Sequence, residues 1–511
     1  MPLDRRTLLT ASAAFLLARP DGADADDAFA AVMVTSLGEG RPFSASAVVD
    51  AARGLSRLPY VPADIVLPAR FQNLAYDDYI KIMSRRDRAS WSGDSVGFAI
   101  EPLHRGFVFD MPVALHLVEK GAVRRVAYSP DQFEYPEGVL PTTSVDTAFS
   151  GFRILGGRAG DLVERAIFQG ATYFRALAEG QNYGAMARGL SIRTADPEGE
   201  EIPAFRAYWI EKPAAGDPLI IHAIADSESM TAAFRFAVRF GDMTTLDTEL
   251  TVFARTDVPS LGIAGMQTTY FFGPNDRKGF DDVRAAAFEN SGLQMWRGNG
   301  EWLWRSVSNP AALQISAFVD TDPKGFGFLQ RERNSASFED DNQMFERRPS
   351  LWVEPVGAWG AGAVELIEIP TRSDINDNII SYWRPKDILA AGTSRRYAYR
   401  QFWCWEPGEQ PQGPTVTQTR SGAGATPSSR RFIVAFSGES LRNITADALK
   451  IAITLSAGTV LSQRVISLAD QAMARVLFEV DLGGATLIEM RMTLSASNAV
   501  HSETWLYRWT T

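Results

Sequence analysis

The chain contains very little of the residues that build metal centres and disulfides. Cys404 is its single cysteine, which excludes an internal disulfide and a cysteine-based zinc site. The four histidines, His104, His116, His222 and His501, are widely separated and show none of the spacings typical of metal ligands. The sequence therefore implies no metal and no organic cofactor.

Excess positive charge and long apolar runs are also missing. The 511 residues include 51 Lys and Arg against 61 Asp and Glu, a net charge of −10, and the basic residues are scattered. Because nucleic-acid-binding proteins need a clustered basic patch, nucleic acid is excluded as a partner. No segment reaches the roughly 18 apolar residues of a transmembrane helix, so we expect no membrane span in the mature protein.

Several standard catalytic motifs are absent as well. The sequence has no G-x-S-x-G and no Walker A pattern, and the scarcity of histidine argues against a Ser-His-Asp triad. What it has in abundance is carboxylate together with 12 Trp, 13 Tyr and 30 Phe. Aromatic faces stack on sugar rings, and paired carboxylates are the groups that hydrolyse glycosidic bonds.

The N-terminus has the composition of an export signal. Arg5 and Arg6 precede an apolar run over 8–17, and Ala23 and Ala25 form a small-residue cleavage site. The paired arginines indicate a twin-arginine signal over residues 1–25, with an ordinary secretory signal as the alternative. Either interpretation predicts an exported mature protein.

Strand patterns dominate the rest of the chain. Residues 106–129 predict a hairpin, with Val113, Leu115 and Leu117 on one face and a turn at 119–121. Helical periodicity is rarer. It predicts helices over 161–180 and 68–85. We therefore expect an all-β protein with a few helices.

A change of amino-acid composition divides the chain. Residues 406–430 are rich in Pro, Gly, Ser and Thr, which indicates a linker. In the alternating strands that follow, Ile488, Met490 and Met492 share one face. The length of this segment suits a small immunoglobulin-like β-sandwich over 431–511. Residues 28–405 then form a large β-sandwich domain.

A polar segment lies between two apolar runs at 369–383, "IPTRSDINDNIISYW". Asp374 and Asp377 are three residues apart, which in a strand would place them on opposite faces. They can serve one site only if the chain forms a loop, which Pro370 and the Asp/Asn density favour. An ordinary Asx-rich turn is the other interpretation.

Three segments within 60 residues combine aromatic, arginine and carboxylate side chains. They are "GEWLWR" (300–305), "GFGFLQRERNSASFEDD" (325–341) and "RRPSLWVEPVGAWG" (347–360). Each alone fits a strand with one buried aromatic face and one solvated face. Together they indicate a polar cleft with aromatic walls.

These segments resemble a known family, the periplasmic glucan biosynthesis proteins G and D (MdoG/OpgG and OpgD). The resemblance is colinear from about residue 40 to 405, and the twin-arginine signal favours the D branch. It implies a galactose-mutarotase-like β-sandwich followed by a small immunoglobulin-like domain. The matching segments are "YFRALAEGQNYGAMARGLSIRT", "ADSESMTAAFRF", "GEWLWR", "GFGFLQRER", "RRPSLWVEP", "WGAGAVELIEIPT" and "DNIISYW".

The resemblance also implies an activity. Family members act in the periplasm on osmoregulated glucans with a β-1,2-linked backbone, some as anomer-inverting endo-glucanases and others as transglycosylases. Its general acid corresponds to Asp377, with Asp374 as the usual acidic neighbour. On the base side the family has His-Asp-Ser-Asp-Gly-Leu, whereas this chain has "FENSGL". Glu289 thus replaces the first Asp, and Ser291 replaces the second.

We therefore expect a periplasmic enzyme, a glycoside hydrolase or transglycosylase, with β-1,2-glucan as its partner. The catalytic residues are Asp377, Glu289 and Asp374. The rewritten base motif supports an alternative, a non-catalytic glucan-binding or scaffolding protein that assists export or modification of the glucan. Motif position implies these substrate-binding residues: Tyr183, Arg188, Trp302, Trp304, Arg331, Arg333, Arg347, Trp352, Glu354 and Trp383.

Overall fold

Strands far outnumber helices among the described residues, which confirms the all-β class. The computed structural model describes residues 37–38, 40, 42–69, 71–136, 147–158, 161–496 and 500–511. The predicted export signal at 1–25 lies outside these residues. Within them, no helix has the length and apolar character needed to cross a membrane.

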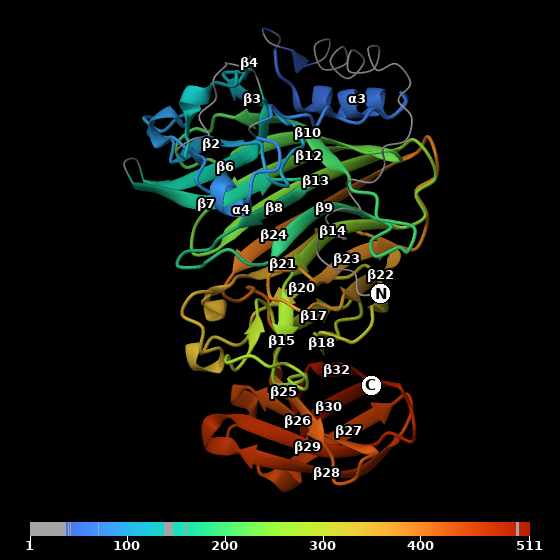
Figure 1. Ribbon diagram of the computed structural model, residues 1–511. Helices are drawn as coiled ribbons and strands as arrows, with labels where there is room; N and C mark the ends of the chain where they lie inside the picture. The colour runs from blue at the N-terminus through green and yellow to red at the C-terminus, as the bar shows by residue number, and fades with distance from the viewer. Residues whose placement is uncertain are drawn as a thin grey trace. The chain divides into compact units, whose positions relative to one another are not determined.

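The chain forms two compact units, whose strands are labelled in Figure 1. Unit 1 extends to Glu179 and includes Met186–Gly265 and Arg384–Gln401. Unit 2 consists of Gly180–Ala185, Met266–Trp383 and Phe402–Thr511.

In its described residues, unit 1 is built mostly from antiparallel strands with one helix of several turns, while β3 and β10 pair in parallel. One run of its strands has the order β13-β12-β11-β10-β3-β4, and another has the order β14-β9-β8-β7-β6-β2. Its elements are α3 (Ala45–Leu55), α4 (Tyr76–Tyr79), β1 (Met83–Ser84), β2 (Phe98–His104), β3 (Ala114–Glu119), β4 (Ala122–Arg125), β5 (Phe133–Glu134), β6 (Phe149–Arg158), β7 (Asp161–Gln169), β8 (Tyr173–Ala176), β9 (Met186–Ile192), β10 (Ala204–Glu211), β11 (Leu219–Asp226), β12 (Met230–Arg239), β13 (Thr244–Ala254), and most of β14 (Leu261–Thr268) and of β24 (Ser394–Cys404).

The hairpin predicted over 106–129 is confirmed as β3 and β4. Lys120 and Gly121 have positive φ angles of 51° and 78°, which is the backbone of a tight hairpin turn. Leu115 and Leu117 are buried on one face, as their alternation predicts. Here local chemistry alone determines the structure.

The helix predicted over 161–180 is wrong, because this segment forms the antiparallel strands β7 and β8. Phe168 stacks on Phe152 of β6 at 5.2 Å and on Phe174 of β8 at 4.9 Å. Gly170, with φ at 75°, makes the turn between them. Stacking of aromatic side chains across strands stabilises this segment as strands. The intrinsic helix propensity of its residues is small enough for this tertiary packing to override it. The helix predicted over 68–85 shrinks to the single turn of α4.

Unit 2 contains three main groups of strands. Their orders are β27-β30-β32-β18-β17-β20-β21, β19-β22-β23 and β25-β26-β29-β28. The strands are β15 (Tyr270–Phe272), β16 (Ala287–Phe288), β17 (Gly292–Trp296), β18 (Trp302–Ser306), β19 (Gln314–Thr321), β20 (Gly325–Leu329), β21 (Ser350–Val356), β22 (Ala361–Glu368), β23 (Ile379–Pro385), β25 (Thr415–Ala423), β26 (Ser429–Ser437), β27 (Leu449–Leu455), β28 (Thr459–Leu468), β29 (Met473–Asp481), β30 (Leu487–Ala496), β31 (Val500–His501) and β32 (Thr504–Thr510).

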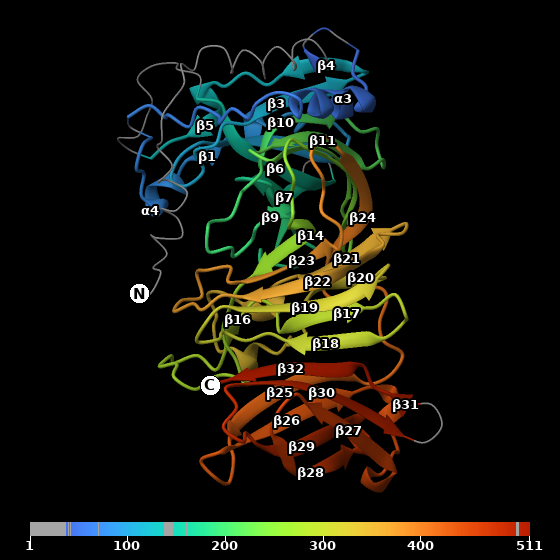
Figure 2. The same ribbon diagram turned by 90° about the vertical axis from the view of Figure 1, so that its right-hand side faces the viewer.

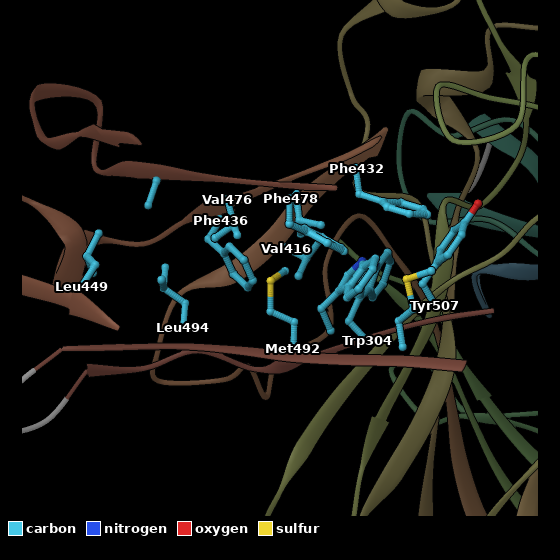
Figure 3. Close-up of a cluster of buried hydrophobic side chains, with 14 of the residues drawn as sticks. Trp304, Val416, Phe432, Phe436, Leu449, Val476, Phe478, Met492, Leu494 and Tyr507 are labelled. Carbon is cyan, nitrogen blue, oxygen red and sulfur yellow. The ribbon is translucent and has the colours of Figure 1, made fainter. Parts of the chain in front are cut away.

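The C-terminal strands share one core with earlier parts of unit 2. β18 pairs in parallel with β32, as Figure 2 shows. Trp304 and Trp352 pack with Phe432, Phe478 and apolar side chains of β30 and β32, and Figure 3 shows Trp304 among them. Residues on both sides of the predicted 406–430 linker therefore belong to the same compact unit.

The segment predicted as a linker is only partly irregular. Residues 415–423 form β25, which pairs along its length with β26. The segment can do so because Val416 is buried in the core while its polar neighbours stay at the surface. The predicted alternation in β30 is confirmed, with Ile488, Met490 and Met492 all buried.

Candidate active site

The end of β14 and the residue after it hold the first predicted catalytic carboxylate. Gln267 donates from Nε2 to Oδ2 of Asp377 at 3.0 Å, and Thr269 donates from Oγ1 to Oδ1 at 3.1 Å. Both oxygens of the half-buried Asp377 are thus engaged, which fixes the plane of its carboxyl group.

The second carboxylate, Glu289, is anchored to the same segment. Its backbone N–H donates to the carbonyl of Thr269 at 2.9 Å, and its Oε2 lies 3.3 Å from the backbone nitrogen of Thr269. The hydroxyl of Thr268 is 3.2 Å from the same oxygen but only 2.6 Å from Oδ1 of Asn290. A hydroxyl has one proton, so the shorter contact takes it and Thr269 is the main donor to Glu289.

Thr269 therefore connects the two carboxylates. It contacts Asp377 through its side chain and Glu289 through its backbone. The backbone nitrogen and Oγ1 of one threonine are about 3–4 Å apart, so the two carboxylate oxygens that they contact are at most about 10 Å apart. The carboxyl groups of inverting glycosidases are roughly 6.5–9.5 Å apart, which is within this limit. Nη1 of Arg348 lies 3.9 Å from the other oxygen of Glu289.

The segment that carries Asp377 is a closed loop, as its Asp/Asn density predicts. Ile369 donates its backbone N–H to the carbonyl of Asn378 at 2.9 Å, and the Asn378 side chain returns a bond to Ile369 at 2.9 Å. Oδ1 of Asn378 also accepts from the backbone of Tyr270 at 2.9 Å. These bonds hold the base of the loop against the segment that contacts Asp377.

Asp374 is directed to a different partner from the one expected. Its Oδ2 lies 2.7 Å from Nη1 of Arg284, which also binds Asp282 and Asp340. Asp374 is therefore part of an ion-pair cluster that includes the loop residue Arg284.

Three predicted sugar platforms are core residues. Trp304, Trp352 and Trp383 each expose 2% or less of their surface, so the prediction that they line a cleft does not match their burial. Trp302 is half-buried, but Trp296 stacks on it at 4.8 Å and Trp352 at 6.0 Å. The hydrophobic gain from packing these indoles together explains why "GEWLWR" is rich in tryptophan.

Two of the predicted arginines contact protein groups. Arg331 pairs with Glu503 at 2.5 Å and lies 3.6 Å above the ring of Trp304. Arg333 donates to the carbonyls of Glu346, Arg348 and Trp405 at 2.6–2.8 Å. Burial lowers the pKa of Arg333 to about 10. Both arginines thus hold segments of unit 2 together.

The remaining predicted residues lie in different elements. Arg347 is exposed at the end of a short 3-10 turn, Tyr183 is half-buried, and Glu354 accepts from Nε1 of Trp352 at 3.0 Å. Arg188 lies in β9 of unit 1, where it is buried and paired with Glu200.

Comparison with known proteins identifies the relatives of this chain. The family model described as "Periplasmic glucan biosynthesis protein, MdoG" matches residues 43–509. The chain belongs to this family.

Individual relatives agree with this assignment. A Shewanella sp. (strain ANA-3) protein named "Glucans biosynthesis protein G" is 43% identical over 92% of this chain and 87% of its own length. Proteins of the same name from Bradyrhizobium diazoefficiens and Vibrio cholerae are 38% and 40% identical, covering 99% and 92% of this chain and 100% and 87% of their own lengths. The chain is therefore a member of a periplasmic glucan biosynthesis family.

One solved structure of another kind shows a slight likeness. A galactose mutarotase related enzyme from Lactobacillus acidophilus matches 50% of this chain and 94% of its own, with 7% sequence identity and a TM-score of 0.22. A likeness at this level supports no conclusion about function.

The residues that join the site of this MdoG-family chain carry no signal in the sequence. Gln267, Thr268 and Thr269 are neutral side chains at the end of a strand, and no charge or spacing distinguishes them. Arg284 and Arg348 are two of many scattered arginines. Their position in the site depends on pairing between segments far apart in the chain.

Proposed function

We propose that this protein cleaves or rearranges β-1,2-glucan, with Asp377 as general acid and Glu289 on the base side. Asp377 gives its proton to the glycosidic oxygen as the bond to the anomeric carbon breaks. Glu289 takes a proton from the attacking water, or from a glucan hydroxyl in transglycosylation. Attack from the opposite face inverts the anomeric centre.

The observation that carries this proposal is the joint anchoring of both carboxylates by Thr269. Its hydroxyl can donate to an ionised Asp377 or accept from a protonated one, so the contact persists in both states. The amide of Gln267 keeps the other oxygen in place. A general acid needs this constancy of position while it gains and loses its proton.

Product analysis from linear β-1,2-glucan tests the proposal. We expect the mature protein to give shorter or rearranged chains and Asp377→Asn to give none, because an amide cannot donate the proton. Shorter linear products indicate hydrolysis, and products of altered linkage or cyclic form indicate transfer. An Asp377→Asn variant as active as the wild type would refute the role of Asp377.

A scaffolding function is the second candidate, and the base side motivates it. Ser291 stands where the family motif has a carboxylate, and its hydroxyl donates to the carbonyl of Leu329 at 3.1 Å. Only Glu289 then offers a base in this motif. A scaffold would bind β-1,2-glucan, leave it unchanged over long incubation, and bind equally well as Asp377→Asn.

A further inference from the structure

One guanidinium group joins three loops of unit 2. Nη1 of Arg284 lies 2.7 Å from Oδ2 of Asp374 and 2.9 Å from Oδ2 of Asp340. Nε and Nη2 bind the two oxygens of Asp282 at 3.0 and 2.8 Å. We call these four residues the Arg284 clamp.

Each loop in the clamp continues into a charged residue of the candidate site. Arg284 precedes Glu289 by five residues, and Asp374 precedes Asp377 by three. The loop of Asp340 continues to Arg348, whose Nη1 is 3.9 Å from Glu289. The clamp thus ties the acid segment to the base segment a few residues away from either carboxylate.

The clamp is built more firmly than an exposed ion pair. Its four side chains expose between 8% and 21% of their surface, so water screens them only in part. Oδ1 of Asp340 also accepts from the backbone N–H groups of Asn342 and Gln343 at 3.0 and 2.9 Å. Hydrogen bonding by Arg284 lowers the pKa of Asp282 to about 2, so this carboxylate is ionised at neutral pH.

We propose that Arg284 is a positioning residue that sets the spacing between Asp377 and Glu289 by holding their loops together. This inference rests on the proposed function and adds a residue to it. A planar guanidinium with five N–H donors can bridge three carboxylates, whereas the ammonium of lysine is a point charge with another reach. An arginine-to-lysine change therefore preserves the charge but releases the geometry.

The experiment compares Arg284→Lys with the wild type on linear β-1,2-glucan. We expect kcat to fall roughly 10- to 100-fold with KM within about twofold, because misplacing a catalytic group by about 1 Å costs on that scale. The matched control is Arg442→Lys, which changes an exposed arginine paired with Glu439 in the same unit and should leave both constants unchanged.

Chemical rescue separates positioning from a loss of folding. Guanidinium ion at millimolar concentration should restore part of the kcat of Arg284→Ala and none of that of Asp377→Asn. An Arg284→Lys variant with wild-type kcat would overturn the inference and leave the proposed function standing. The inference would also be overturned if Arg284→Ala lost kcat together with a lower melting temperature and guanidinium ion restored none of that kcat. A wild type that converts no glucan would refute both.

Discussion

At the residue scale, Thr269 is the centre of the candidate site. Its side chain and its backbone serve different carboxylates, so the two contacts can be separated by substitution. The same residue also fixes the backbone of Glu289 through its carbonyl at 2.9 Å. A neutral residue thereby determines the geometry of two charged ones.

We predict that Thr269→Val lowers kcat on β-1,2-glucan by roughly 10- to 100-fold, because a hydrogen bond to a charged group is worth roughly 1.5–3 kcal/mol. Valine has the shape of threonine, and it keeps the backbone N–H near Glu289. Thr269→Ser retains the hydroxyl and should keep most of the activity. Steady-state kinetics of the three proteins measure this, and equal kcat in valine and wild type would contradict the prediction.

His104 links the stability of unit 1 to pH. It is 3% exposed, and its Nδ1 lies 2.6 Å from the carbonyl of Arg105, so the neutral ring carries its proton there. Nε2 is then free to accept from the hydroxyl of Tyr128 at 3.0 Å. Burial lowers the pKa of His104 from 6.5 to about 4.

The pKa of His104 is lower in the folded protein than in the unfolded chain. Between these two pKa values the unfolded chain therefore binds one proton that the folded protein does not. The contribution of the neutral His104 ring to stability is fully present above pH 6.5 and is lost as the pH falls toward 4. We predict that His104 contributes roughly 3 kcal/mol to the loss of unfolding free energy between pH 7 and 4. Denaturant unfolding of His104→Asn should show a shallower pH dependence, whereas the exposed His501→Asn should match the wild type.

At the scale of elements, a buried ion pair connects two sheets of unit 2. Arg305 in β18 and Glu368 in β22 are each 1% exposed, and Nη2 lies 2.8 Å from Oε2. The other oxygen of Glu368 accepts from the backbone and hydroxyl of Ser308 at 2.8 and 3.1 Å. The arginine of "GEWLWR" is therefore a structural residue.

Removing one member of this pair leaves a buried charge without its partner. We predict that Arg305→Met lowers the free energy of unfolding by about 3–5 kcal/mol. The double variant Arg305→Met, Glu368→Leu should recover most of this loss, because no buried charge remains. Thermal or denaturant unfolding measures both, and a double variant less stable than the single one would contradict this account.

Elements with strict alternation or a defined turn were predictable. The hairpin of β3 and β4 and the alternation of β30 follow from side-chain period and from Lys120-Gly121. The segment 161–180 was not, because its apolar residues fit a helix as well as two strands. Only the stacking of Phe168 between the neighbouring strands decides between them.

At the scale of the whole molecule, the C-terminal strands complete unit 2. β32 pairs with β18, and Trp304 and Trp352 lie in the core formed with β26, β29 and β30. A separate immunoglobulin-like domain over 431–511 stays a prediction, but its apolar core is not separate from the rest of unit 2.

We predict that a chain ending at residue 405 does not fold as a stable protein. Truncation exposes the indole of Trp304 and leaves the buried contacts of Arg331 with Glu503 unmade. Burying such a large side chain typically stabilises a core by about 3–5 kcal/mol relative to alanine. Circular dichroism and thermal unfolding of 26–405 against 26–511 measure this, and a cooperative transition of the short chain at the full-length temperature would contradict it.

The sequence by itself determined the all-β class, the family and the loop that carries Asp377, and it singled out Asp377 and Glu289 as candidate carboxylates. These depend on local composition, period and motif, which neighbouring residues carry. Tertiary structure alone decided that Trp304, Trp352 and Trp383 are core residues, that Asp374 binds Arg284 and that Thr269 joins Asp377 to Glu289. The contacts of Asp374 and Thr269 connect segments 20 to 108 residues apart, and strand pairing, which the sequence pattern does not specify, brings these segments together.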